Sequence, residues 1–461
     1  MGNPLKIVTG AQPPKPPQKP QPTEREMRHL PDDDELAINL VEGWKGRYAY
    51  FYDNWHEYRD GMWHKLHDAQ IQQEIRNYLR DCRRKHPRIR LSNKLIVGIG
   101  KMASLDCYID SSVINNQPNY LNVRNGLVNL ETLCLEKHRP DTYLTWRLDF
   151  DYDPDAESPH FIRYLRTSLT TEDEQVDERM IDLVQEAFGY SLTADTSRKV
   201  SFWVIGPKDS GKSTLLAFLR QMMGSMHGTV NLNDLAENKY VLSTLVGKRV
   251  VTCTESDAGS VLPDGIFKML VGGEDEVQAD VKHKDPITFV PQCKVWWGMN
   301  DMPRVRDRSG AVYRRILMVI FPRSLPQERQ IIGLIDKLAE ERSGVLNWAI
   351  SGLLRLRRRG HFIEPAASQR RMDEFKLLND PEALFVKECG ILDASLRTQA
   401  TDLHTAITAW RKANGYPSKS TIQVRKDLER LRIFRHKYND ANYYDGFALN
   451  DDGREYAGVI S

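Results

Sequence analysis

Short apolar runs alternate with polar and helical segments through the middle of the chain. Four runs rich in β-branched and aromatic residues lie at 200–205, 250–253, 295–298 and 316–321. Strands that are apolar at nearly every position are typical of a parallel sheet buried on both faces. The pattern therefore predicts an α/β core built on a mostly parallel sheet between residues 198 and 322.

The region before this core has a mixed pattern. Aromatic and polar residues alternate on both sides of Asp60-Gly61, which predicts a β-hairpin. Apolar residues recur at helical spacing in 69–84 and in 173–190. These elements together predict an α+β domain ahead of the sheet.

The region after the core is largely helical at first. Residues 326–358 have helical spacing, and this stretch runs into the basic residues 355–359 before Gly360. Three helical patterns and two strand patterns then follow, at 381–391, 401–413, 419–432, 433–438 and 443–449. Three helices followed by a hairpin are typical of a winged helix.

Composition places the chain among ordinary globular proteins. Its 461 residues are 40% hydrophobic and 28% charged, which predicts several domains with well-filled cores. Residues 1–30 include a proline-rich stretch and read as an unstructured tail. No run approaches the roughly 18–20 apolar residues of a membrane span, and no secretory signal is evident. We therefore expect a cytoplasmic protein.

Charge and cysteine content exclude some classes of site. The formal net charge is only +2, so a nucleic-acid partner has to be inferred from local basic patches. The six cysteines are widely spaced and form no C-x-x-C pair. This spacing argues against a zinc site and against a disulfide framework.

One motif carries most of the chemistry. Residues 206–213 match G-x-x-x-x-G-K-S, with a β-run before them and an amphipathic helix after them. The backbone N–H groups of such a loop face phosphate oxygens at a helix N-terminus. Lys212 is expected to reach the β- and γ-phosphates of ATP, and Ser213 to ligate Mg²⁺. The expected nucleotide-binding residues are Gly206, Pro207, Lys208, Asp209, Ser210, Gly211, Lys212, Ser213 and Thr214.

Two later strands end in polar residues that suit such a site. The run 250–253 leads to Glu255, a candidate for metal binding and for activation of the attacking water, and Asp257 is a second candidate. Asn300 ends the next run and is a candidate for contact with the γ-phosphate, although an Asn-Asp pair also forms turns.

Basic residues provide two further candidates. Arg314 and Arg315 precede the last strand, where a guanidinium can act on a neighbouring subunit's phosphate or can simply be a surface group. Lys282, His283 and Lys284 form the tip between two predicted β-arms. That tip suits contact with a nucleic-acid backbone, and a solvated turn is the alternative interpretation.

The order of these motifs resembles superfamily 3 helicases, and most closely the phage/plasmid primase family and the poxvirus-type primase–helicases. The segments 268–274, 294–300 and 314–321 are similar to the family's "K-x-L-x-G-G-E/D", "K-x-x-x-x-x-N" and "R-R-x-x-x-x-x-F". Upstream, 122–130 resembles "N-x-x-N-G-x-x-D-L", with Asn129 in place of Asp, and 185–193 also matches. The resemblance extends over roughly residues 45–455.

The resemblance implies an AAA+-like, hexameric ring ATPase that translocates on single-stranded DNA with ATP and Mg²⁺. By the same resemblance, Glu255 activates water, Asn300 senses the γ-phosphate, and Arg315, with Arg314 beside it, acts on the neighbouring subunit. Lys282 and His283 would lie on a hairpin in the pore. We expect a role in replication of a phage, prophage or mobile element in a bacterial cell.

The expected domain order follows from these segments: a tail at 1–30, an α+β domain at 31–195, the ATPase core at 196–325, a helical lid and basic linker at 326–375, and a winged helix at 376–461. Because the matched region begins near residue 45, no room remains for a primase–polymerase domain ahead of it. We therefore expect a separate primase or polymerase partner.

Two other functions are compatible with the sequence. A DNA-binding ATPase that melts or loads an origin, without processive unwinding, would use the winged helix and the basic run 355–359. Arg425, Lys426 and Arg430 on its last helix could reach duplex DNA. A small-molecule kinase would use the same phosphate-binding loop, but the basic hairpin and paired arginines argue against it.

Overall fold

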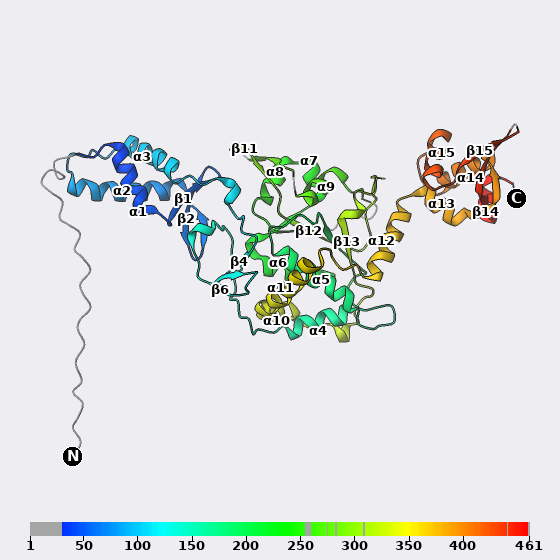
Figure 1. Cartoon of the computed structure of the whole chain (residues 1–461), viewed down its shortest axis with the longest axis horizontal. Coiled ribbons are helices and arrows are strands. Elements are labelled where there is room, and N and C mark those ends of the chain that lie inside the picture. The colour runs from blue at the N-terminus through cyan, green and yellow to red at the C-terminus, as the bar shows by residue number, and fades with distance from the viewer. Residues whose placement is uncertain are drawn as a thin grey trace, which may run out of the picture. The chain divides into compact units, whose positions relative to one another are not determined.

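The computed structural model describes residues 30–253, 260–273, 275–281, 284–307, 309–439 and 441–459. Within these ranges, the side chains of residues 232, 235, 236, 239, 284, 285 and 329 are not described. The chain divides into two compact units (Figure 1). The first unit comprises residues up to 114 together with 140–143, and the second unit comprises 115–139 together with 144 onwards.

The first unit combines three helices with a small antiparallel sheet. Its elements are α1 (Asp33–Trp44), β1 (Tyr48–Phe51), β2 (Asn54–Arg59), β3 (Met62–Lys65), α2 (Asp68–Lys85) and α3 (Asn93–Asp106). The predicted hairpin at Asp60-Gly61 is confirmed, because both residues have positive φ (51° and 77°) and connect β2 to β3. Such a pair of left-handed residues matches the twist of a two-residue hairpin.

A five-stranded parallel sheet forms the centre of the second unit. Its order is β13-β7-β12-β9-β8. The strands are β7 (Ser201–Ile205), β8 (His227–Val230), β9 (Val250–Cys253), β12 (Lys294–Met299) and β13 (Ile316–Ile320). The four predicted strands are present. The edge strand β8 was not predicted, because its sequence His-Gly-Thr-Val has only one buried position.

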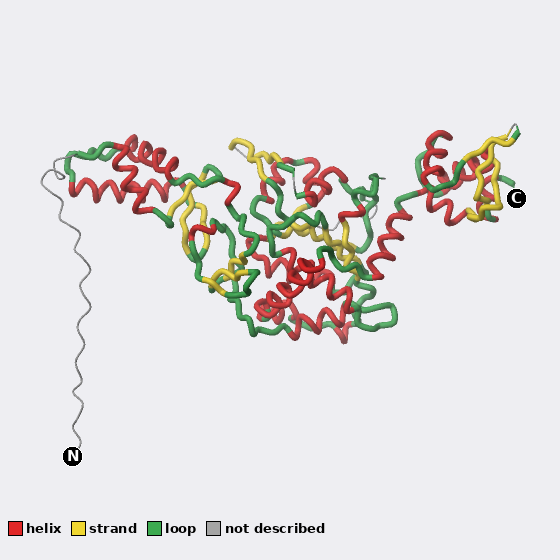
Figure 2. Tube along the Cα trace, viewed as in Figure 1, coloured by secondary structure: helices red, strands yellow, loops and turns green. Residues whose placement is uncertain are grey.

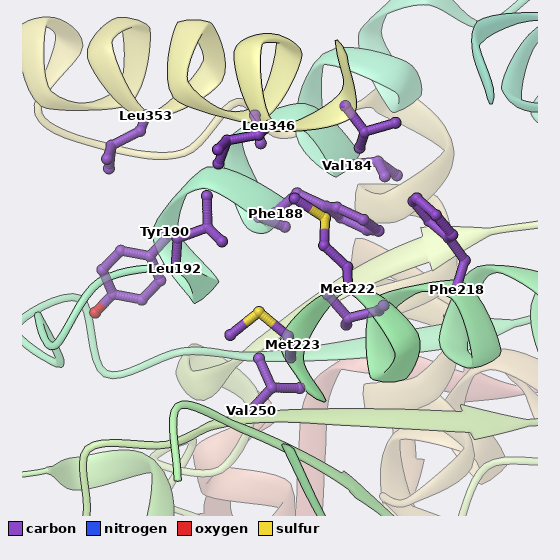
Figure 3. Packing of buried hydrophobic residues seen from close by; sticks show 14 of the residues in the cluster. Val184, Phe188, Tyr190, Leu192, Phe218, Met222, Met223, Val250, Leu346 and Leu353 are labelled. Atoms are coloured by element: carbon purple, nitrogen blue, oxygen red, sulfur yellow. The ribbon is translucent and has the colours of Figure 1, made fainter. Parts of the chain in front are cut away.

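The sheet is covered on both faces. In β7, Phe202 and Val204 join one hydrophobic cluster, whereas Trp203 and Ile205 join another, as the two-residue period of a strand requires. The first face carries α4 (Pro159–Ser168), α5 (Glu178–Ser191), α6 (Lys212–Met223), α10 (Leu334–Glu340) and α11 (Arg342–Arg359), which are labelled in Figure 1. Figure 2 shows helices on this side of the strands, and Figure 3 shows side chains of α5, α6 and α11 packed together. The other face carries α7 (Leu232–Glu237), α8 (Lys239–Leu242), α9 (Asp264–Gly272) and the hairpin of β10 (Val277–Val281) and β11 (Lys284–Phe289).

Helices α5 and α11 pack closely against one another. A Cβ atom on Gly352 would lie 2.5 Å from the carbonyl oxygen of Gln185, so the backbones approach too closely for a larger residue. Beside this crossing the fully buried Glu186 accepts from Arg355 at 2.8 Å and also pairs with Arg359. Two arginines of the basic run 355–359 therefore hold helices together, which removes them from the DNA contact considered for that run.

The segment ahead of the sheet belongs to the same hydrophobic core. It contains β4 (Tyr120–Val123), β5 (Gly126–Asn129) and β6 (Leu135–Glu136), which form an antiparallel sheet. Leu121 and Val128 share one buried cluster with α5, α6 and α11. The predicted domain boundary at residue 195 therefore does not coincide with a break in packing.

The C-terminal part has its own core. Its elements are α13 (Pro381–Cys389), β14 (Gly390–Gln399), α14 (Ala400–Ala413), α15 (Thr421–Arg430), β15 (Arg435–Tyr438), β16 (Ala441–Leu449) and α16 (Asp451–Ala457). Helix α12 (Ala366–Leu378), which precedes them, packs on the central sheet through Phe375. The strands pair antiparallel in the order β14-β16-β15, and a cluster that includes Phe385, Trp410 and Phe447 fills the interior. Strand β14 was not predicted, because most of its side chains are exposed and polar.

Across the described ranges, no helix combines the length and apolar composition that a bilayer crossing requires.

Candidate functional site

The predicted phosphate-binding loop connects β7 to α6. Asp209 and Gly211 have positive φ (56° and 101°), which curls the chain ahead of the first helical turn. A Cβ atom on Gly206 would lie 2.2 Å from the carbonyl oxygen of Phe321, so only glycine fits the start of the loop. The loop thus has the strand–turn–helix context that the motif requires.

Lys212 lies at the centre of the loop. Its residue is only 6% exposed, and its Nζ donates to the carbonyl oxygens of Gly206 (2.6 Å) and Pro207 and to Ser210 Oγ (3.3 Å). The ammonium is therefore desolvated and oriented by the loop itself. A phosphate oxygen that takes the place of these acceptors would meet a preoriented cation.

Other elements hold the loop from outside. Tyr164 on α4 donates its hydroxyl to the carbonyl oxygen of Gly211 at 2.8 Å, and complete burial raises the pKa of this phenol. After β13, the N–H of Leu325 donates to Asp209 O at 2.9 Å, and Ser324 Oγ donates to Lys208 O at 2.7 Å. Sequence reasoning missed Tyr164, because its position in an amphipathic helix marks it only as a core residue.

A cavity of about 760 Å³ opens above the loop. It is lined by residues 208–214, by α4, by Asn300 and by the segment 325–334. This volume falls within the range of small-molecule and cofactor sites. Seven of the nine predicted nucleotide-binding residues thus line one cavity, and Gly206 and Pro207 form the loop beneath it.

Asn300 follows directly after β12, on the strand beside β7. Met299 pairs with Ile205 in the parallel register, and Met299 O accepts from Gly206 N at 3.4 Å. The carboxyl ends of adjacent parallel strands meet at one edge of the sheet. The structure therefore brings Asn300 to the same cavity as Ser213 and Lys212.

The predicted acids Glu255 and Asp257 lie outside the described residues. The strand before them, β9, ends at Cys253, which pairs with Trp297 of β12. Strand β9 thus lies beside β12, on the side away from β7. The described residues contain no group of three or more His, Cys, Asp or Glu side chains placed to hold a metal. The Ser213 hydroxyl nevertheless suits Mg²⁺, which keeps several waters and takes few protein ligands beside a triphosphate.

Arg314 and Arg315 lie at the opposite end of the sheet. They precede β13, whose first residue Ile316 pairs with Ser201 at the start of β7. The five residues of β7 span about 16 Å, so this chain's own loop begins at the far end of that strand. Arg314 is exposed, whereas Arg315 donates to Ala311 O at 2.8 Å. The structure does not bring these arginines to the cavity.

The first lysines of the family-like segments 268–274 and 294–300 both have partners within the protein. Lys268 pairs with Asp307 at 3.1 Å, and hydrogen bonds from Ser309 are the main cause that lowers the pKa of Asp307 to about 2. Lys294 is buried against the ring of Tyr190 and donates to Thr193 O, and burial lowers its pKa well below the usual value. Neither lysine lines the cavity.

The predicted DNA-contacting tip is only partly described. Val281 of β10 pairs with Lys284 of β11, so two antiparallel arms are present as predicted. Lys282 and His283 lie outside the described residues, as does the side chain of Lys284.

Two family models match parts of the chain. Residues 27–169 match a model described as D5 N terminal like, and residues 204–315 match a family of unknown function, DUF5906. Two similar curated proteins have names that propose helicase activity. One is L207/L206 of Acanthamoeba polyphaga mimivirus, 24% identical over 47% of this chain, and the other is 121R of Invertebrate iridescent virus 3, 24% identical over 49%. The chain spans about a quarter of each relative's length (23% and 25%).

A solved structure has a similar fold. The apo A form of the NrS-1 C-terminal region aligns over 90% of this chain and 99% of that chain, with a TM-score of 0.51 and 12% identity. This likeness concerns the fold alone. Together with the two family models, it fits the primase–helicase resemblance read from the sequence.

Proposed function

We propose that this chain is an ATP-dependent DNA helicase of superfamily 3 that acts in the replication of a phage, prophage or mobile element. The observation that carries the proposal is the loop of residues 206–213, with Lys212 preoriented beneath a cavity of nucleotide size. The helicase names of viral relatives support the same reading. In this proposal ATP and Mg²⁺ bind at the cavity, and hydrolysis drives movement along single-stranded DNA.

Each residue predicted for the site takes a distinct role in the proposal. Loop N–H groups and Lys212 hold the β- and γ-phosphates, and Ser213 ligates Mg²⁺. Asn300 orients the γ-phosphate or the attacking water. Glu255, two residues beyond the end of β9, acts as the general base, and Asp257 is the alternative acid.

The decisive test is ATP hydrolysis and strand separation by Lys212→Ala. We expect loss of both activities, because the ammonium of Lys212 lies at the centre of the loop and is held there by three loop oxygens. Lys387→Ala is the matched control, since this lysine is exposed on α13 and does not line the cavity. Strand separation that persists in Lys212→Ala would contradict the proposal.

The proposal places hydrolysis at interfaces between subunits of a homo-oligomer, with a hexameric ring as the expected form. Support comes from the position of Arg314 and Arg315 at the end of the sheet away from the loop. Arginines there suit a neighbour's γ-phosphate better than their own. In such a ring, Lys282, His283 and Lys284 would face the DNA strand.

We further infer that the C-terminal part is a winged helix. Its order, helix–strand–helix–helix–strand–strand from α13 to β16, supports this assignment. On α15, Arg425 pairs with Glu429 and Arg430 pairs with Asp380, whereas Lys426 has no ion pair among the described residues. This domain favours a second candidate function, an ATPase that melts or loads an origin.

Footprinting distinguishes the two candidates. Protection of a fixed duplex site would favour origin melting or loading, whereas preference for a free single strand would favour translocation. ATP hydrolysis that rises on addition of single-stranded DNA would support the helicase assignment.

A further inference from the structure

The first unit carries a concentration of basic side chains that the nucleotide chemistry does not use. Residues 76–94 contain eight arginines and lysines and one acid, Asp81, a net charge of +7. The whole chain has a net charge of only +2. This stretch covers the second half of α2, the connection after it and the start of α3.

Part of this charge lines a groove between α2 and α3. The groove has a volume of about 1120 Å³. One wall includes Arg76, Arg80, Arg83 and Arg84, and the other is formed by Leu91, Ser92, Asn93, Ile96 and Val97. Positions three and four residues apart lie on one side of a helix, so Arg76, Arg80 and Arg83 form a row. We call this feature the arginine groove.

Most arginines of the groove have no acidic partner. Arg84 pairs with Asp81 at 2.9 Å, but within the described ranges the side chains of Arg76, Arg80 and Arg83 make no hydrogen bond or ion pair. All three are exposed. Arg355, in contrast, is held by a buried carboxylate in the second unit. The groove therefore presents solvent-exposed guanidinium donors that no protein acceptor occupies.

Folding does not require this row. Helix α2 packs through Ile71, Ile75 and Leu79, which are nearly inaccessible and belong to the core of the first unit. The arginines lie on another side of the helix. Their clustering against mutual repulsion points to an anionic ligand.

We propose that the arginine groove binds the phosphate backbone of duplex DNA. Guanidinium forks match phosphate oxygens, and the nine residues from Arg76 to Arg84 extend about 12 Å along α2. That length corresponds to three or four phosphates at about 3.4 Å per nucleotide of one strand. No aromatic side chain lines the groove, so it lacks the stacking surface with which proteins bind unpaired bases.

This proposal rests on the proposed function in one respect, the choice of DNA as the partner. ATP takes no part in it, and the groove lies in the first unit. Binding can therefore be measured without nucleotide, so a failure of ATP hydrolysis and a failure of the groove are separate results.

The test uses the full chain with Arg76→Glu and Arg80→Glu together. The matched control is Lys45→Glu with Arg59→Glu, which changes the charge equally at exposed positions of the first unit outside the groove. Fluorescence anisotropy with a labelled blunt duplex, over a range of salt and without nucleotide, gives the Kd. A single strand of the same length is the second probe.

We expect the groove variant to bind duplex at least about tenfold more weakly than the control. The slope of log K against log salt should fall in magnitude by about two, because each lost phosphate contact releases about 0.9 fewer counterions. Arg76→Lys with Arg80→Lys should recover most of the affinity. Both charge-reversed variants should keep the unstimulated ATP hydrolysis of the parent and its thermal unfolding.

Equal weakening in the groove and control variants would overturn the proposal, since it would reflect net charge alone. An unchanged salt slope would overturn it as well. Weakening confined to the single-stranded probe would reject a duplex as the ligand.

Discussion

At the residue scale, the hydroxyl of Tyr164 connects a flanking helix to the phosphate-binding loop. Tyr164→Phe removes the 2.8 Å bond to Gly211 O, which then accepts only from Leu215 N. Loss of one hydrogen bond costs about 0.5–1.5 kcal/mol, so we expect nucleotide affinity to fall by up to about tenfold if the loop loses its position. Titration with a fluorescent ATP analogue measures the change.

The control for this prediction is Tyr190→Phe. Tyr190 is equally buried, and its hydroxyl accepts from Arg198 N at 3.2 Å, but it does not contact the loop. Tyr164 acts as a positioning residue only if its variant loses affinity beyond that of Tyr190→Phe. Similar losses in both would indicate a general effect on the core.

A second residue-scale prediction concerns pH. His56 stacks on Phe51 with ring centroids 3.5 Å apart, and burial lowers its pKa from 6.5 to about 4. Below pH 6.5 the unfolded chain takes up a proton that the folded chain accepts only near pH 4. The stability that this group contributes is therefore present above pH 6.5 and is lost as the pH falls towards 4.

Urea unfolding at several pH values tests this sign. The parent should lose more stability between pH 7 and pH 5 than His56→Gln, which cannot be protonated. His227, whose pKa is also lowered to about 4, titrates in both proteins and cancels in the comparison. Identical pH profiles would show that His56 does not carry the effect.

At the element scale, the α5–α11 pair depends on one buried carboxylate. Glu186→Gln leaves Arg355 and Arg359 without the charge that they share. Removing one partner of a fully buried ion pair costs about 3–5 kcal/mol. Because both arginines are partly exposed and Arg355 also pairs with Asp182 at 3.0 Å, we expect a loss at the lower end of this range in the free energy of unfolding. Denaturant unfolding provides the measurement.

Glu374→Gln on α12 is the comparison for that loss. Its pair with Arg371 is exposed on both sides and should contribute less than about 1 kcal/mol. If the two variants differ by less than that amount, the buried pair does not stabilise the crossing.

The sequence predicted those elements whose burial left a clear pattern. β7, β9 and β12 are apolar at nearly every position, and the loop motif marks their functional edge. β8 and β14 were missed, because one has a single buried residue and the other is largely exposed. Each of these strands pairs with a strand that lies later in the chain, and the local sequence pattern does not indicate such pairing.

The candidate site likewise contains residues that the sequence predicted and residues that it did not. The loop and Asn300 were predicted, since each follows directly from a strand end. Tyr164 could not be predicted, because its role arises from a contact 47 residues away in the chain. In the basic run 355–359, which was considered for a DNA contact, Arg355 and Arg359 pair with Glu186, and no local pattern could identify this partner on another helix.

At the scale of the whole molecule, the proposed function requires two chains for each complete site. Arg315→Ala and Lys212→Ala should each abolish ATP hydrolysis when alone. Mixed in equal amounts, they should recover activity, because about a quarter of the interfaces in a random assembly combine an intact loop with an intact arginine. Hydrolysis rates across mixing ratios test this, and the absence of any recovery would indicate that the arginine does not act between chains.

The loop and the paired arginines occupy opposite ends of one short sheet, which has a consequence for assembly. A molecule that gives an arginine on one side and receives one on the other meets its neighbours head to tail, through two different surfaces. Two such molecules can complete only one site, and every open chain has an unfinished end. Closure is thus the only arrangement in which every loop receives an arginine, and a single copy that lacks both Lys212 and Arg315 would disable the sites on both sides of it.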